Sequence, residues 1–231
     1  MPPIVSKDEW LTARKALLTE EKAFNQARDA LSSKRRALPM VAVEKDYVFN
    51  GAKGDISLAE LFGGKSQLIV YHFMYGPDWE EGCVSCSFWA DNFDNIPKHL
   101  AARDAGFAVV SRAPYPTLAA YQKRMGWSFP WVSAFDTSFN TDFNVSFTQE
   151  QKDAGKAVYN YQPSSFPSDE APGISVFSRD GAGNIFHTYS TYSRGLDMLN
   201  GAYHYLDLLP KGRDEAELPW PMAWLKRRDD Y

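Results

Sequence analysis

The stretch Gln67-Leu68-Ile69-Val70-Tyr71-His72-Phe73-Met74 leads through the loop 75–82 into Cys83-Val84-Ser85-Cys86. Its first eight residues are largely apolar and rich in β-forming side chains, as is typical of a strand buried inside a sheet. Residues 87–100 then carry apolar side chains at mostly helical spacing. The stretch therefore predicts a strand, a loop and a helix, with both cysteines where the helix begins.

Working outward, short apolar runs and turn residues mark the other elements. We expect extended segments at 47–49, 107–111, 127–133, 174–177 and 185–189, and helices at 57–62, 114–125 and 196–206. The last two strands flank an Asp180-Gly181 turn, which is typical of a hairpin. A parallel βαβ part followed by a hairpin and a closing helix is the plan of a thioredoxin fold. We therefore expect an α/β thioredoxin-like fold, a central mixed sheet flanked by helices.

Residues outside this plan form extensions. Ser6 and Glu9 have the spacing of a capping box, and helical periodicity continues to Arg36 before Pro39. We expect an N-terminal helical extension over 1–38, a thioredoxin-like domain over 39–212 with an insertion or lid near 136–167, and a C-terminal tail over 213–231. The leading helix could pack on the domain or on a second subunit, which makes a homodimer one expected arrangement.

Composition limits the partners. The formal net charge of -4 gives no overall positive field, so we expect no nucleic-acid partner. The basic runs 34–36 and 226–228 are most simply a solvated helix end and a solvated tail. The longest apolar run, Leu68-Ile69-Val70, is far shorter than the roughly 20 residues of a membrane span. Because the first residues also lack an export signal, we expect a cytoplasmic protein with no membrane partner.

The chain has two cysteines, Cys83 and Cys86. A thiolate is the reactive form, and a helix N-terminus favours it through free N–H groups and the helix dipole. Cys86 lies one turn later and could resolve a mixed disulfide on Cys83. Glu80 and Glu81 oppose this reactivity, because nearby negative charge raises the pKa of a thiol. The pattern favours a redox dithiol with Cys83 as the nucleophile.

Two other interpretations stay open. The cysteines could bind a metal or small ligand together with a histidine, although a four-cysteine zinc site is excluded by count. The four histidines are His72, His99, His187 and His204, and their spacings match no zinc finger. Alternatively the cysteines are inert and the protein acts through its leading helix. His72, in an apolar strand, is more simply a hydrogen-bonded core residue, and Arg112 could bind an anion or pair with Glu80 or Glu81.

Several stretches carry a resemblance to a known family. They are 73–83, 86–91, 111–114, 125–131 and 187–197, for example Tyr75-Gly76-Pro77-Asp78-Trp79 and Met125-Gly126-Trp127-Ser128-Phe129-Pro130-Trp131. The chain resembles, from about residue 5 to 215, the domain-of-unknown-function family 899 of the thioredoxin-like superfamily. The resemblance implies the fold and assigns no activity. The chain departs from peroxiredoxins, which carry Pro-x-x-x-Thr/Ser-x-x-Cys, because Pro77 stands six residues before Cys83 with no Thr or Ser between.

Pro172 directly precedes the expected strand at 174–177. In thioredoxin-like proteins a cis proline occupies this point and faces the cysteines, so the resemblance implies a cis bond here. The sequence thus predicts a thiol–disulfide oxidoreductase in which Cys83 attacks, Cys86 resolves and Pro172 shapes the groove. We expect a protein or small-molecule disulfide as substrate, no metal, and no cofactor beyond an external reductant.

Overall fold

The computed structural model describes residues 2–231 and divides the chain into two units, one ending at Pro39 and the other spanning Met40–Tyr231. The first unit contains helix α1 (Lys7–Arg36). Ser6 and Glu9 form the predicted capping box, with the Ser6 N–H 2.9 Å from the Glu9 carboxylate. The basic run 34–36 occupies the last turn, where cations interact favourably with the helix dipole.

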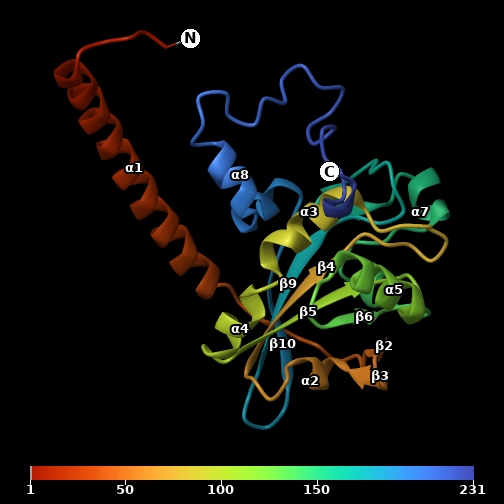
Figure 1. Ribbon diagram of the computed structural model, residues 1–231. Coiled ribbons are helices and arrows are strands. Elements are labelled where there is room, and N and C mark those ends of the chain that lie inside the picture. The colour runs from red at the N-terminus through yellow and green to blue at the C-terminus, as the bar shows by residue number, and fades with distance from the viewer. Residues whose placement is uncertain (1) are drawn as a thin grey trace. The chain divides into compact units, whose positions relative to one another are not determined.

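Within the described residues, the second unit is built on an eight-stranded sheet. In spatial order its strands are β1 (Val41–Ala42), β10 (Ile185–Tyr192), β9 (Gly173–Arg179), β4 (Gln67–His72), β5 (Ala105–Ser111), β6 (Trp131–Ser133), β2 (Val48–Gly51) and β3 (Gly54–Ser57) (Figure 1). Strands β4, β5 and β6 are parallel, whereas β9 runs antiparallel to both β4 and β10. The order β10-β9-β4-β5 with these directions is the thioredoxin-like arrangement, which confirms the predicted fold class.

Side-chain alternation along β4 separates two apolar layers. Tyr71 and Phe73 point to the layer that also contains side chains of α3, α5 and η1. Leu68 and Val70 point to the opposite layer, with α2. The bounds of these and the neighbouring helices are α2 (Leu58–Leu61), α3 (Val84–Phe93), α4 (Ile96–Ala101), α5 (Tyr115–Met125), η1, a 3-10 helix (Ser193–Leu199), and α8 (Gly201–Leu206).

The expected insertion is folded and packed. It contains α6 (Phe139–Asp142), α7 (Gln149–Asp153), β7 (Val158–Tyr159) and β8 (Gln162–Pro163). Phe139 is fully buried in the same layer as α2. Val145, Phe147 and Tyr159 form a separate buried cluster with Tyr192 of β10. The segment is therefore part of the domain's core.

Two expected helices are interrupted. The helix expected over 87–100 is split into α3 and α4, because Pro97 sits in the first turn of α4 and cannot donate a backbone hydrogen bond to a continuous helix. The helix expected over 196–206 is split at Asn200, whose side chain accepts the Tyr203 N–H at 3.1 Å and so caps α8.

The tail after α8 has little regular structure beyond the 3-10 turn η2 (Arg228–Asp230), yet it is anchored. One Glu215 carboxylate oxygen accepts hydrogen bonds from the Tyr203 hydroxyl, the Met222 N–H and the Trp224 indole at 2.9, 3.1 and 2.7 Å. The Trp224 ring also lies edge-on to Phe88 of α3, with 5.7 Å between centroids. Among residues 2–231, no helix combines the length and apolar character needed to span a membrane.

Candidate active site

Cys83 occupies the N-cap position of α3, directly after the loop that leaves β4. Its backbone N–H donates to the Met74 carbonyl at 3.1 Å, and its Sγ accepts the Cys86 N–H at 3.5 Å. The side chain is partly exposed. Cys83 therefore presents a sulfur at the positive end of a helix while its backbone is fixed to the sheet.

Cys86 lies one turn further along α3 and is buried. Its Sγ accepts the Met74 N–H at 3.4 Å. Burial raises the pKa of Cys86 well above its ordinary value. The neighbouring Tyr71 side chain acts to lower the pKa of this thiol. The two cysteines thus have different environments, one open to reagents and the other held as a thiol.

The two sulfurs interact. A hydrogen bond from the Cys86 thiol lowers the pKa of Cys83 to about 7, although burial acts in the opposite direction. The N–H groups of Cys86 and Ser85, and then the positive charge of Arg227, also lower this pKa. A thiol with such a pKa is largely thiolate just above neutral pH, which is the form that attacks disulfides.

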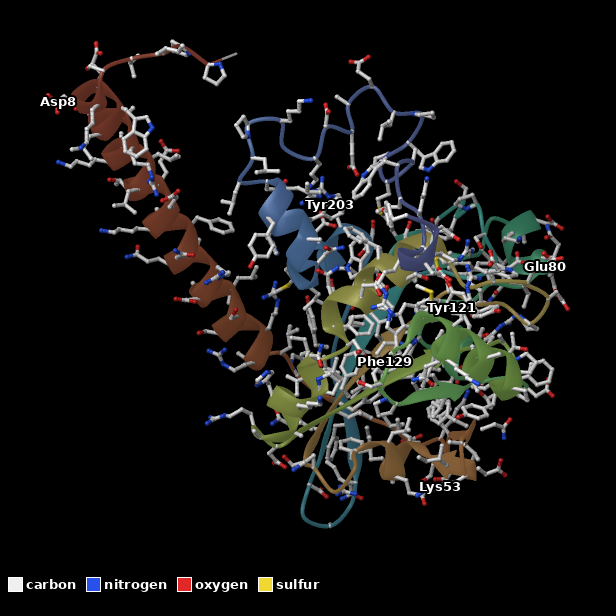
Figure 2. All side chains as sticks on the ribbon, viewed as in Figure 1. Asp8, Lys53, Glu80, Tyr121, Phe129 and Tyr203 are labelled. Carbon is white, nitrogen blue, oxygen red and sulfur yellow. The ribbon has the colours of Figure 1, made fainter. Side chains whose placement is uncertain are left out.

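Arg227 of the tail is part of this site. Its guanidinium donates to the Gly82 carbonyl and to the Tyr121 hydroxyl, each at 3.0 Å, and pairs with the Glu81 carboxylate at 2.8 Å (Tyr121 is labelled in Figure 2). Its side chain is only 16% exposed, so the expectation that the run 226–228 is simply solvated is wrong for Arg227. Glu81 also pairs with Arg124, so two cations neutralise the charge of Glu81, one of the two carboxylates expected to oppose Cys83 ionisation.

Gly82 is fixed by packing around this contact. A Cβ added at Gly82 would lie 2.8 Å from Phe73 Cε1 and 2.9 Å from Tyr121 Cε1, both atoms of buried rings. Only glycine brings the backbone close enough to these rings for its carbonyl to reach Arg227.

Replacing Arg227 with Gln is expected to raise the pKa of Cys83, because a positive charge that favours the thiolate is lost. We expect a rise of about half a unit to one unit, and alkylation by iodoacetamide slower by about three- to tenfold at pH 6. The measurement is the alkylation rate across pH 5–9, read by mass as modification of Cys83.

Arg228→Gln is the matched control, since this neighbouring side chain is half exposed and pairs with Asp91. Its profile should match that of the parent protein. Arg227→Lys keeps the charge and should recover part of the shift. An Arg227→Gln profile that overlays the parent profile would show that the tail does not influence the nucleophile.

Both cysteines open onto a cavity of about 330 Å³. Besides the sulfurs, its walls include Trp89 of α3, Leu196 of η1, and Met222 of the tail. Tyr159 and Phe166, from the second half of the chain, close another side. The sequence did not identify Tyr159, Leu196 or Met222 as site residues, because each lies far along the chain from the cysteines and has no local motif.

Pro172 also lines this cavity, but the expectation of a cis bond is wrong: no peptide bond in residues 2–231 is cis. The backbone before Pro172 is held extended by hydrogen bonds to the insertion. The Ala171 N–H donates to the Val145 carbonyl at 2.8 Å, and the Tyr159 hydroxyl donates to the Pro172 carbonyl at 2.8 Å. These hydrogen bonds hold the backbone on both sides of this peptide bond to the insertion.

The histidine nearest in sequence to the active loop faces away from it. His72 is buried, packs against Phe139 on the far side of the sheet, and lies 2.8 Å from the Ser175 hydroxyl, as expected for a core histidine. Burial lowers the pKa of His72 to about 3. His187 shares that layer through its contact with Phe143. In residues 2–231, no cluster of three or more His, Cys, Asp or Glu side chains is placed to hold a metal ion.

Arg112 pairs with neither Glu80 nor Glu81. Its Nε lies 2.8 Å from an oxygen of Glu170, whose side chain is only 1% exposed. The other Glu170 oxygen accepts from the Ser146 hydroxyl at 2.6 Å. This contact ties the end of β5 to the insertion that carries Tyr159, so it is structural and indirectly shapes the cavity.

Several solved structures share the general arrangement. A cysteine-to-serine mutant of peroxiredoxin Q from Xanthomonas campestris has a TM-score of 0.46 at 14% identity, covering 73% of this chain and 98% of that one. The peroxidoxin BcpB of Mycobacterium tuberculosis has a TM-score of 0.46 at 13% identity, covering 71% and 93%. A cysteine-to-serine mutant of the PrxQ of Xylella fastidiosa has a TM-score of 0.45 at 12% identity, covering 73% and 97%.

No curated protein sequence matches the chain. A family model does: the one described as "Bacterial protein of unknown function (DUF899)" matches residues 1–231. That match spans the whole chain and agrees with the resemblance carried by the stretches around Cys83 and Trp127. The chain therefore belongs to the DUF899 family of bacterial proteins of unknown function.

Proposed function

We propose that this protein is a thiol–disulfide oxidoreductase. The observation that carries the proposal is the position of Cys83 at the N-cap of α3, with its sulfur hydrogen-bonded to Cys86 and open to a cavity. Cys83 is the nucleophile and Cys86 the resolving thiol. Pro172 and the neighbouring walls hold the substrate beside Cys83.

The chemistry follows from the different environments of the two thiols. The Cys83 thiolate attacks one sulfur of a disulfide, forms a mixed disulfide and releases the other sulfur as a thiolate. Cys86 then gives its proton to the thiolate leaving in the second step and attacks the Cys83 sulfur. The substrate gains two electrons, and the protein is left with a Cys83–Cys86 disulfide. An external dithiol reductant restores the protein.

The test is the equilibrium between the dithiol and the disulfide in glutathione buffers, read by alkylation and mass on metal-stripped protein. We expect a reversible two-electron couple between about −270 and −200 mV, the range of thioredoxins and glutaredoxins. Thiols that never pair, or that alkylate only after unfolding, would overturn the proposal.

A further inference from the structure

The backbone beside Pro172 is already paired within the chain. The Phe147 N–H donates to the Asp169 carbonyl at 2.9 Å, and the Ala171 N–H donates to the Val145 carbonyl at 2.8 Å. An isolated antiparallel bridge joins Ser146 to Glu170 between them. An extended substrate peptide binds beside a strand by using free backbone groups. Next to this cavity the backbone groups of residues 169–171 are already hydrogen-bonded to the insertion. A protein substrate therefore finds no free strand edge there to pair with.

The polar atoms of two aromatic residues in the cavity wall are bonded to backbone groups. The Trp89 indole N–H donates to the Leu196 carbonyl at 3.0 Å. The Tyr159 hydroxyl donates to the Pro172 carbonyl and accepts the Ser193 N–H at 2.9 Å. Because these groups are satisfied by backbone, the rings present apolar surface to a ligand.

The charges at the cavity are already paired. Its charged lining residues are Arg194 and Asp197, whose side chains lie 2.9 Å apart, and Asp197 also pairs with Arg213. Arg227 nearby is bound to Glu81, the Gly82 carbonyl and Tyr121. The Arg194 side chain is 84% exposed, so solvent screens its charge and a substrate carboxylate would gain little from it. Asp197 already has two cationic partners, so a substrate ammonium group would have to compete with them.

We propose that the substrates of this site are small, uncharged, largely apolar disulfides, bound between the aromatic walls and the Met222 side chain of the tail. The proposal rests on the proposed function and goes beyond it by excluding protein disulfides and glutathione disulfide. A cavity of about 330 Å³ accepts a molecule of this size and stands at the lower end of small-molecule pockets. In the reaction, Cys83 bonds to one alkylthio group, the other leaves as a thiol, and Cys86 releases the first.

The experiment is a single turnover of the reduced protein with a set of disulfides, quenched by alkylation and read by mass. The probes are dipropyl disulfide, dicationic cystamine, dianionic dithiodipropionate, glutathione disulfide and insulin. Each rate is divided by the rate of the same disulfide with free 2-mercaptoethanol, which removes differences in intrinsic reactivity. We expect dipropyl disulfide to exceed each charged probe by about tenfold or more, as polar or charged groups lose heavily in apolar sites.

Met222→Lys tests the wall directly. A cation at this position should move the preference toward dithiodipropionate by roughly threefold or more. Met198→Lys is the matched control, because that methionine is 49% exposed and does not line the cavity. Its preference should equal that of the parent.

Two failures are distinguishable. If the Cys83–Cys86 couple does not form in glutathione buffers, the proposed function itself fails. If the couple forms, but the normalised rates are equal for all probes or highest for insulin or a charged disulfide, only the substrate class is wrong. An unchanged preference in Met222→Lys would likewise overturn the assignment of the tail as a wall.

Discussion

Cys86→Ser is expected to stop the reaction at a mixed disulfide on Cys83, whereas Cys83→Ser abolishes it at the start. In the first variant the partly exposed nucleophile remains at the helix N-cap and no resolving thiol is left. In the second, the remaining Cys86 thiol is buried and its pKa is raised, so it is a poor nucleophile. The measurement is intact-protein mass after exposure to dipropyl disulfide.

The Cys86→Ser variant should gain one propylthio group, and peptide mapping should place it on Cys83. A serine hydroxyl at position 86 can still donate a hydrogen bond to the Cys83 sulfur, so this adduct should form at a rate close to that of the first step of the parent. Ser85→Ala keeps both thiols and should turn over like the parent. An adduct on Cys86 in the Cys83→Ser variant would reverse the assigned roles.

The fold could be predicted from local patterns because most strands of the thioredoxin-like core are short apolar runs bounded by turn residues, and both signals are local in the sequence. The run 67–74 is buried on both faces, so its apolar residues are continuous and the strand is easily recognised. The hairpin around Asp180 was equally easy to recognise, because a turn sequence separates two β-forming runs. The helix breaks at Pro97 and Asn200 were missed, since apolar spacing continued across both positions. The short edge strands β1 and β3 and the small elements of the insertion were missed as well, because they are too short to show a period.

The sequence predicted the two cysteines of the site but not the residues that the tail brings to it. The position of Cys83 and Cys86 at a helix start follows from adjacent residues. Arg227, by contrast, contacts a carbonyl 145 residues away in the chain. A basic run looks the same whether it is solvated or folded onto a carboxylate, so charge pattern alone could not place it. Contacts set by tertiary packing of the tail have no sequence period that would reveal them.

Pro172 illustrates the same limit. Its place before a core strand was predicted, and it does line the cavity. The conformation of its peptide bond was predicted wrongly, and the backbone pairing of Ala171 with the insertion was not visible in the sequence. The insertion, described from sequence as an insertion or lid, pairs its backbone with residues 169–171 beside Pro172. Its residues Tyr159 and Phe166 also line the cavity onto which the cysteines open.

Arg112→Ala is expected to lower the free energy of unfolding by about 3 kcal/mol at pH 7, because it leaves a buried carboxylate without its cation. Glu170 is 1% exposed and lies 2.8 Å from Arg112 Nε. Burial raises the pKa of Glu170, while the Arg112 charge and the Ser146 hydrogen bond oppose that rise. The measurement is urea unfolding of the parent and variant, followed by circular dichroism. Lys45→Ala removes a 60% exposed side chain that pairs with Asp142, and it should cost less than about 1 kcal/mol.

The pH dependence separates a charge effect from a packing effect. Without Arg112 the folded-state pKa of Glu170 rises further, so the penalty is present above that pKa and shrinks as pH falls toward the ordinary carboxyl value of about 4.3. Arg112→Ala with Glu170→Gln should recover much of the loss at pH 7, since a neutral amide needs no cation. A loss that is the same at pH 5 and pH 7, and the same in the double variant, would mean that the Arg112 side chain acts through packing. Because Ser146 and Glu170 flank the pairing that positions Pro172 and Tyr159, the variant should also loosen the cavity wall, lowering the preference for dipropyl disulfide before global unfolding begins.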